Sequence, residues 1–201
     1  MNNYNRANRG NYQGVDPLDI TDRIIAIGKK MYDKGYIVAS DGNISVRIAE
    51  NALLVTASGV CKGEMTRDDI IECDLNGKSA SGRQVTSEIA MHLAVYRLRE
   101  DVHAVIHAHP PYAVALSLRG LVHKLSLLPE VTMALGDVRL TEYAAPSSRE
   151  GAVVVSKLIT RHSALILDRH GSLTVGGDLV DAYWKLERLE YASKVVLVGD
   201  K

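Results

Sequence analysis

Helical and strand-like patterns alternate along the whole 201-residue chain, and this alternation limits the possible folds more than any other feature. Near the start, apolar residues recur at the spacing of one helical face, at Ile20, Ile24, Ile27 and Met31. Gly35 suits the C-terminal cap of that helix. Short strand-like runs follow, and helical runs return after them. The mixture indicates an α/β or α+β fold.

The chain has no internal repeat and no linker long enough to divide it. Strands are expected at 44–48, 52–56, 69–75, 104–109 and 164–168, and helices at 86–99, 112–118, 149–160 and 178–198. Residues 1–15 are rich in Asn and Gly and poor in large apolar groups, so we expect a mobile tail there. Residues 16–201 are therefore predicted to form one domain.

The charge balance argues against several classes of partner. The chain has 24 Lys plus Arg and 24 Asp plus Glu, so it has no basic surplus to attract nucleic acid. No apolar run is long enough for a membrane span or a signal peptide. Cys61 and Cys73 lack CxxC spacing, which fits a reducing compartment. We expect a cytoplasmic protein that binds neither nucleic acid nor a membrane.

Two histidines point to a metal site. His107 and His109 stand two apart on the strand expected at 104–109, so both side chains leave the same face. His170 follows another expected strand, and Gly171 allows a sharp turn there. Three neutral imidazoles would suit zinc and leave one position open for a substrate. The alternative is that the pair makes only surface hydrogen bonds.

The remaining histidines carry less information. His92 lies four residues after Glu88 on the same helical face, so it either orients that carboxylate or simply packs. His103, His123 and His162 are expected to be solvated.

Three small polar segments could bind an anion. One is the segment 40–45, with Gly42 and Asn43 before a strand. A second is 56–59, with Ser58 and Gly59 after a strand. The third is Thr86-Ser87, at the expected N-terminus of a helix, where the helix dipole favours negative charge. Taken singly, each segment is also explained by ordinary turn or cap chemistry.

Taken in order, the segments GNIS, TASG, TSE, HAHP and RHG resemble the class II aldolase and adducin-head superfamily, specifically its L-fuculose-phosphate aldolase branch. The resemblance runs from about residue 19 to residue 198. It implies a single catalytic domain with a central, largely antiparallel sheet flanked by helices. It also implies a homo-oligomer, usually a cyclic tetramer with active sites between subunits.

The resemblance assigns roles to individual residues. It implies zinc, or another divalent ion, on His107, His109 and His170, and Glu88 as the catalytic acid or base. The phosphate-binding residues implied are Gly42, Asn43, Ser58, Gly59, Thr86 and Ser87. The implied reaction is the reversible cleavage of a ketose 1-phosphate, similar to fuculose 1-phosphate, into dihydroxyacetone phosphate and an aldehyde through a metal-stabilised enediolate.

The sequence departs from the family pattern on the aldehyde side. The tyrosine of the aldolase's C-terminal tail has no counterpart, and Glu130 stands roughly where a neighbouring subunit's tyrosine would be. Tyr112 and Tyr143 are possible substitutes, although with nine tyrosines in the sequence packing is the more ordinary role for any one of them.

Other activities of the superfamily stay open as alternatives. The pentulose-phosphate 4-epimerases have Asp at the position of Glu88, so the glutamate argues against that activity. A sugar-phosphate dehydratase or decarboxylase would share the histidines and the enediolate. A non-catalytic, adducin-like binding module would typically lose the metal ligands, which are present here.

Overall fold

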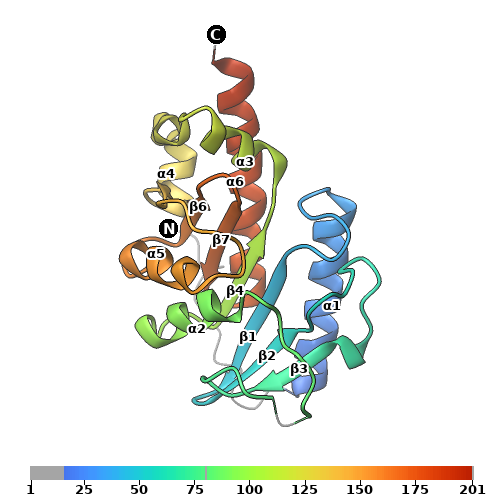
Figure 1. Ribbon diagram of the computed structural model, residues 1–201. Helices are drawn as coiled ribbons and strands as arrows, with labels where there is room; N and C mark the ends of the chain where they lie inside the picture. Colours follow the sequence, from blue (N-terminus) through green and yellow to red (C-terminus); the bar gives the residue numbers. More distant parts are fainter. Residues whose placement is uncertain (1–15, 80, 201) are drawn as a thin grey trace, which may run out of the picture.

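The computed structural model describes residues 16–79 and 81–200, so the tail expected at 1–15 lies outside the described residues. Its centre is one seven-stranded sheet in the order β3-β2-β1-β4-β7-β6-β5 (Figure 1). The strands are β1 Asn43–Ala49, β2 Ala52–Thr56, β3 Ile70–Cys73, β4 Ala104–Ala108, β5 Arg139–Leu140, β6 Ala164–Leu167 and β7 Gly171–Gly176. Among the strands that the structure describes, only β5 and β6 pair in parallel. The predicted α/β fold with a largely antiparallel sheet is confirmed.

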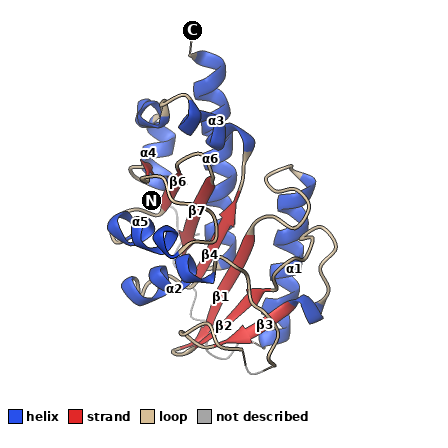
Figure 2. Cartoon of the chain, viewed as in Figure 1, coloured by secondary structure: helices blue, strands red, loops and turns tan. Residues whose placement is uncertain are grey.

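Helices cover both faces of the sheet (Figure 2). They are α1 Pro17–Asp33, α2 Ile89–Leu98, α3 Pro111–Leu118, α4 Pro129–Leu135, α5 Arg149–Ile159 and α6 Leu179–Gly199, with short 3-10 helices η2 at Arg67–Asp69 and η3 at Val122–Leu127. Side chains of a strand alternate between its two faces. On β4, Val105 accordingly packs in the cluster that includes α2 and α5, whereas Ile106 packs in the cluster that includes α1 and α6.

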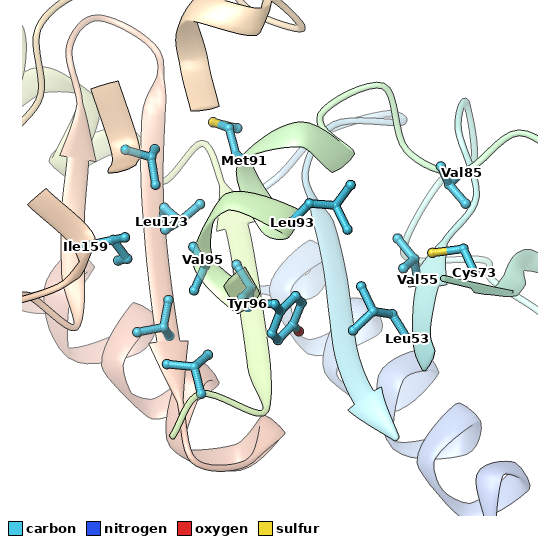
Figure 3. Packing of buried hydrophobic residues seen from close by; sticks show 14 of the residues in the cluster. Leu53, Val55, Cys73, Val85, Met91, Leu93, Val95, Tyr96, Ile159 and Leu173 are labelled. Carbon is cyan, nitrogen blue, oxygen red and sulfur yellow. The ribbon is translucent and has the colours of Figure 1, made fainter. Parts of the chain in front are cut away.

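The face under α2 forms a dense apolar layer. Figure 3 shows Leu93 and Val95 of α2 packed with Leu53, Val55 and Leu173 of the sheet. Burying a side chain of this size contributes about 1.5 to 3 kcal/mol. The layer therefore fixes the position of α2, and with it the polar residues just before that helix.

The first helix follows the signals of the sequence closely. Asp16 caps its N-terminus by accepting a hydrogen bond from the Leu18 amide, and Pro17 occupies the first helical position. Gly35 follows the helix with a φ of +69°, the left-handed conformation expected of a C-terminal cap.

The structure differs from the predicted elements at two places that matter for the site. The helix expected from residue 86 begins at Ile89, because the Thr86 carbonyl and hydroxyl accept the amides of Ile89 and Glu88 in a separate turn. Strand β7 was not predicted at all, since a six-residue run with Gly at both ends carries little strand signal. It pairs with β4 and β6, and so lies in the middle of the sheet.

The pairing register of β1, β4 and β7 brings their ends together at one edge of the sheet. Asn43 of β1 is directly opposite His107 of β4, and Ala108 of β4 is opposite Ser172 of β7. The start of β1, the end of β4 and the turn between β6 and β7 therefore meet at one edge. Within the described part of the chain, no helix is both long and apolar enough to cross a membrane.

Candidate metal centre and phosphate cleft

Three histidines converge at this edge of the sheet. His107 is buried on β4, His109 lies one residue past its end, and His170 lies in the turn between β6 and β7. Their ring centroids are 4.8 to 5.0 Å apart. One nitrogen from each ring lies within 4.8 Å of the others, which is the geometry of a shared metal site.

Gly171 makes this approach possible. A Cβ atom there would lie 2.4 Å from the Ala108 carbonyl oxygen and 2.8 Å from the His109 ring. Any other residue would push the β6–β7 turn away from β4, and His170 would leave the cluster.

Hydrogen bonds fix which nitrogens face the centre. His107 Nδ1 donates to the Ser172 carbonyl at 2.9 Å, and His109 Nδ1 donates to Asp41 Oδ2 at 3.2 Å. Both Nε2 atoms then carry lone pairs, yet they lie only 3.0 Å apart. A carboxylate or carbonyl behind each ring is the usual support of a metal-binding histidine. The donor set therefore fits a cation between the rings.

The rings are also in the correct charge state for a metal. Burial, reinforced by repulsion from His107, lowers the pKa of His170 to about 4. The same two causes lower the pKa of His109. Neutral imidazole is the form that binds metal.

Glu88 completes the cluster. Its Oε1 accepts the Ser147 amide at 2.7 Å, and its Oε2 lies 2.7 Å from His107 Nε2. Among the described residues, Oε2 accepts no well-aligned hydrogen bond although it is buried. Burial raises the pKa of Glu88, but His107 and the Ser147 amide outweigh it and hold the pKa at about 2. The carboxyl group is ionised at neutral pH and faces the three rings.

A cleft of about 310 Å³ opens beside the histidines. Every site residue expected from the sequence lines it, namely Gly42, Asn43, Ser58, Gly59, Thr86, Ser87, Glu88, His107, His109 and His170. The metal-site residues and the small polar segments thus share one cavity, although they come from five separate parts of the chain.

Part of the backbone that was expected to bind an anion is already engaged. The Ser58 amide donates to the Gln84 carbonyl, and the Thr86 amide donates to the Thr56 carbonyl. Ser58 and Thr86 consequently have hydroxyl groups rather than free amides to offer to an anion in the cleft. Gly42 has a φ of +70°, and a Cβ atom there would lie 2.6 Å from Ile37 Cγ2.

Three further residues of the cleft were missed by sequence reasoning. Lys62 is 2% exposed, and its Nζ donates to the carbonyls of Ser40 and Val60, both at 2.7 Å, so it ties two cleft loops together. Burial lowers the pKa of Lys62 to about 8. Asp41 supports His109, as described above. No signal in the sequence marked either residue.

Ser147 is the third missed residue, and it lies after the short strand β5. Besides donating its amide to Glu88, it donates its hydroxyl to Ser87 Oγ at 3.1 Å. Its φ of +59° is uncommon for a residue with a side chain.

Several residues considered from the sequence lie elsewhere. Tyr112 and Tyr143 are not among the residues that line the cleft. His103, His123 and His162 are also outside it; His123 is exposed, and the other two are half-buried.

Comparison with known proteins agrees with this geometry. Residues 22–197 match the family described as Class II Aldolase and Adducin N-terminal domain. The chain belongs to this family. It is similar to an L-fuculose phosphate aldolase of Methanococcus maripaludis, with 37% identity over 89% of this chain and 96% of the relative.

Relatives with a second activity are nearly as similar. A 3-oxo-tetronate 4-phosphate decarboxylase of Pectobacterium atrosepticum is 31% identical over 89% of this chain and 84% of the relative. Among solved structures, an L-fuculose 1-phosphate aldolase superposes with a TM-score of 0.81 at 31% identity, covering 94% of this chain and 89% of the other. This protein is thus an enzyme of the metal-dependent class II aldolase superfamily, in its fuculose-phosphate aldolase-like branch.

Proposed function

We propose that this enzyme cleaves a ketose 1-phosphate, similar to fuculose 1-phosphate, into dihydroxyacetone phosphate and an aldehyde. The observation that carries the proposal is the shared cleft. It holds three convergent imidazoles and an ionised Glu88, and it is also lined by the polar side chains of Asn43, Ser58 and Ser87. A phosphorylated ketose needs both kinds of group at once.

His107, His109 and His170 are the residues that would hold a divalent ion, which we propose to be zinc. The ion supplies Lewis acidity toward the substrate's carbonyl and neighbouring hydroxyl oxygens. The chain itself sets the orientation of the rings, through Ser172 behind His107 and Asp41 behind His109.

Glu88 is the proposed proton carrier. In cleavage, the bond between the third and fourth carbons breaks, its electron pair stays on the third carbon, and the fourth-carbon hydroxyl passes its proton to the ionised Glu88 carboxylate as the aldehyde forms. Glu88 then delivers that proton to the third carbon, which gives dihydroxyacetone phosphate. In the reverse direction it must remove that proton, and its ionised form is ready to do so. Ser147 holds the carboxylate in place.

Decarboxylation of a 3-oxo-tetronate 4-phosphate is the second candidate, favoured by the similarity to the Pectobacterium relative. The two activities differ in product. Zinc-loaded protein should be incubated with ketose 1-phosphates and, separately, with 3-oxo-tetronate 4-phosphates. Release of dihydroxyacetone phosphate from the first supports the aldolase. Carbon dioxide from the second, with no cleavage of the first, would replace it by the decarboxylase.

The phosphate-binding role predicts a selective loss. Replacing Asn43 or Ser87 with Ala removes one charge-assisted donor, and such bonds contribute about 1.5 to 3 kcal/mol. We expect KM for phosphorylated ketoses to rise about 10-fold or more. KM for unphosphorylated analogues that react should change little. Ser126→Ala, at an exposed serine of η3 that does not line the cleft, is the matched control. Equal losses on both substrate types would show that these residues only shape the turn.

We also propose a homo-oligomer that assembles through α6, because this helix exposes a row of apolar residues to solvent. These are Val180, Trp184, Tyr191, Val195 and Val198, with exposures of 37% to 73%. Light scattering at micromolar concentration should give a multiple of 21.9 kDa, with a tetramer expected.

A charge in this row should disrupt the assembly. Trp184→Glu is expected to lower the mass measured by light scattering, because it places a carboxylate where an aromatic side chain would be buried. Val153→Glu, at an exposed apolar residue of α5, is the control and should leave the mass unchanged. A monomeric wild type would contradict the proposal outright.

A further inference from the structure

A buried chain of polar groups runs behind the cleft. His92 of α2 is fully buried, with Nε2 at 2.5 Å from Asn43 Oδ1 and Nδ1 at 2.6 Å from Ser45 Oγ. Ser45 is fully buried as well, and its Oγ lies 2.8 Å from the Tyr96 hydroxyl. Four side chains from β1 and α2 thus form one continuous line that ends at Asn43, a residue of the cleft.

The direction of each hydrogen bond follows from what the groups can do. A carboxamide oxygen only accepts, so the His92 nitrogen that faces Asn43 must carry the hydrogen. The other ring nitrogen then accepts the Ser45 hydroxyl proton. Since Ser45 has only that one proton, its oxygen accepts from Tyr96. Each group therefore donates to the next, from Tyr96 to Ser45, from Ser45 to His92 and from His92 to Asn43.

His92 has to be neutral for this arrangement, because a doubly protonated ring could not accept from Ser45. Burial, with a smaller contribution from His107, lowers the pKa of His92 to about 3. The ring does not reach the Glu88 carboxylate, whose contacts are His107, His170 and Ser147. Of the two roles considered from the sequence, orienting Glu88 has no support in these contacts.

The orientation of the Asn43 carboxamide is coupled to the direction of these hydrogen bonds. With its oxygen held by His92, the amide NH₂ group points the other way and can donate to an anion. If the carboxamide were reversed, the three hydrogen bonds behind it would reverse as well, and its oxygen would meet the anion. That last contact would be unfavourable.

We propose that His92 is a positioning residue, a neutral relay that holds the Asn43 carboxamide with its NH₂ group toward the substrate's phosphoryl group. The relay rests on the proposed phosphate-binding role of the cleft. Ser45 and Tyr96 act in it by setting the tautomer of His92, without touching the substrate.

The tautomer can be observed directly by ¹⁵N NMR of the zinc-loaded full chain, with the His92 signals assigned by their loss in His92→Gln. We expect hydrogen on Nε2 in the wild type. In Ser45→Ala the Nδ1 atom loses its donor, so part of the signal should move to the Nδ1–H form. A wild-type ring with hydrogen on Nδ1 would overturn the relay whatever the binding data show.

Binding of inorganic phosphate to the same protein gives a second readout through a double-mutant cycle. One weakened hydrogen bond corresponds to a roughly 3- to 10-fold loss of affinity, which we expect for Ser45→Ala. Asn43→Ala should weaken binding at least as much, and adding Ser45→Ala to it should have no further effect. Ser193→Ala, at a fully buried serine of α6, is the control for loss of a buried hydroxyl and should bind as the wild type does.

The phosphate-binding results distinguish a failure of the His92 relay from a failure of the proposed phosphate-binding role of the cleft. Independent losses in the double variant would overturn the relay and leave the phosphate cleft standing. A wild type that binds no phosphate would contradict the cleft assignment instead, and the nitrogen spectrum would still decide the tautomer.

Discussion

A His107→Ala/His109→Ala double variant is expected to purify with almost no bound zinc, whereas the wild type should hold about one zinc per chain. The two rings supply two of three proposed ligands, and one remaining imidazole cannot form a tight site. Activity should fall by about 10³-fold or more, because Lewis-acid stabilisation is worth several kcal/mol. Elemental analysis and turnover of the same preparation measure both effects.

The control for this variant removes two rings that lie outside the cleft, in His123→Ala/His162→Ala. It should keep the metal and the activity. Circular dichroism must show that the site variant still folds, since His107 is buried. Full metal occupancy in a folded site variant would refute the three-histidine site.

The Glu88→Gln variant should keep its fold and its metal and lose about 10²-fold or more in turnover. The amide preserves the size of the side chain and can still accept the Ser147 amide, but it cannot take up a proton. Exchange of the hydroxymethyl protons of dihydroxyacetone phosphate into D₂O isolates this step, because it needs no aldehyde. The exchange should fall in parallel with turnover.

Glu50→Gln, in the turn between β1 and β2, is the matched control, since this exposed glutamate is not among the residues that line the cleft. Near-normal exchange in Glu88→Gln, with metal content verified, would assign the proton transfer to another group.

Sequence spacing predicted the features that depend only on neighbouring residues within one helix or one strand. The apolar face of α1 and the shared face of His107 and His109 follow from helical and strand spacing alone. The joining of three polar segments with the histidines could not come from spacing, because their meeting depends on the pairing of distant strands. That expectation came from the resemblance to a family.

The residues that were missed depend on tertiary contacts. Strand β7 is held by its two neighbours, although its own sequence is a weak strand former. Lys62 matters because loop carbonyls surround it, and Ser147 because its backbone turns toward Glu88. A single sequence shows none of these neighbours. The start of α2 was misplaced for a related reason, as the turn at Thr86 competes locally with the helix.

The pairing of Asn43 with His107 across β1 and β4 fixes the distance between these two residues. Side chains of directly opposed residues leave the same face with Cβ atoms about 4.5 to 5.5 Å apart. The distance between the proposed phosphate-binding residue Asn43 and the proposed metal ligand His107 is thus set by the pairing of the two strands. With a metal on the histidines and a phosphate at Asn43, this distance would set how many carbon atoms separate a ligand's phosphate from its chelating oxygens. A shift of the β1–β4 register by one residue would turn Asn43 to the opposite face, so this distance cannot change gradually.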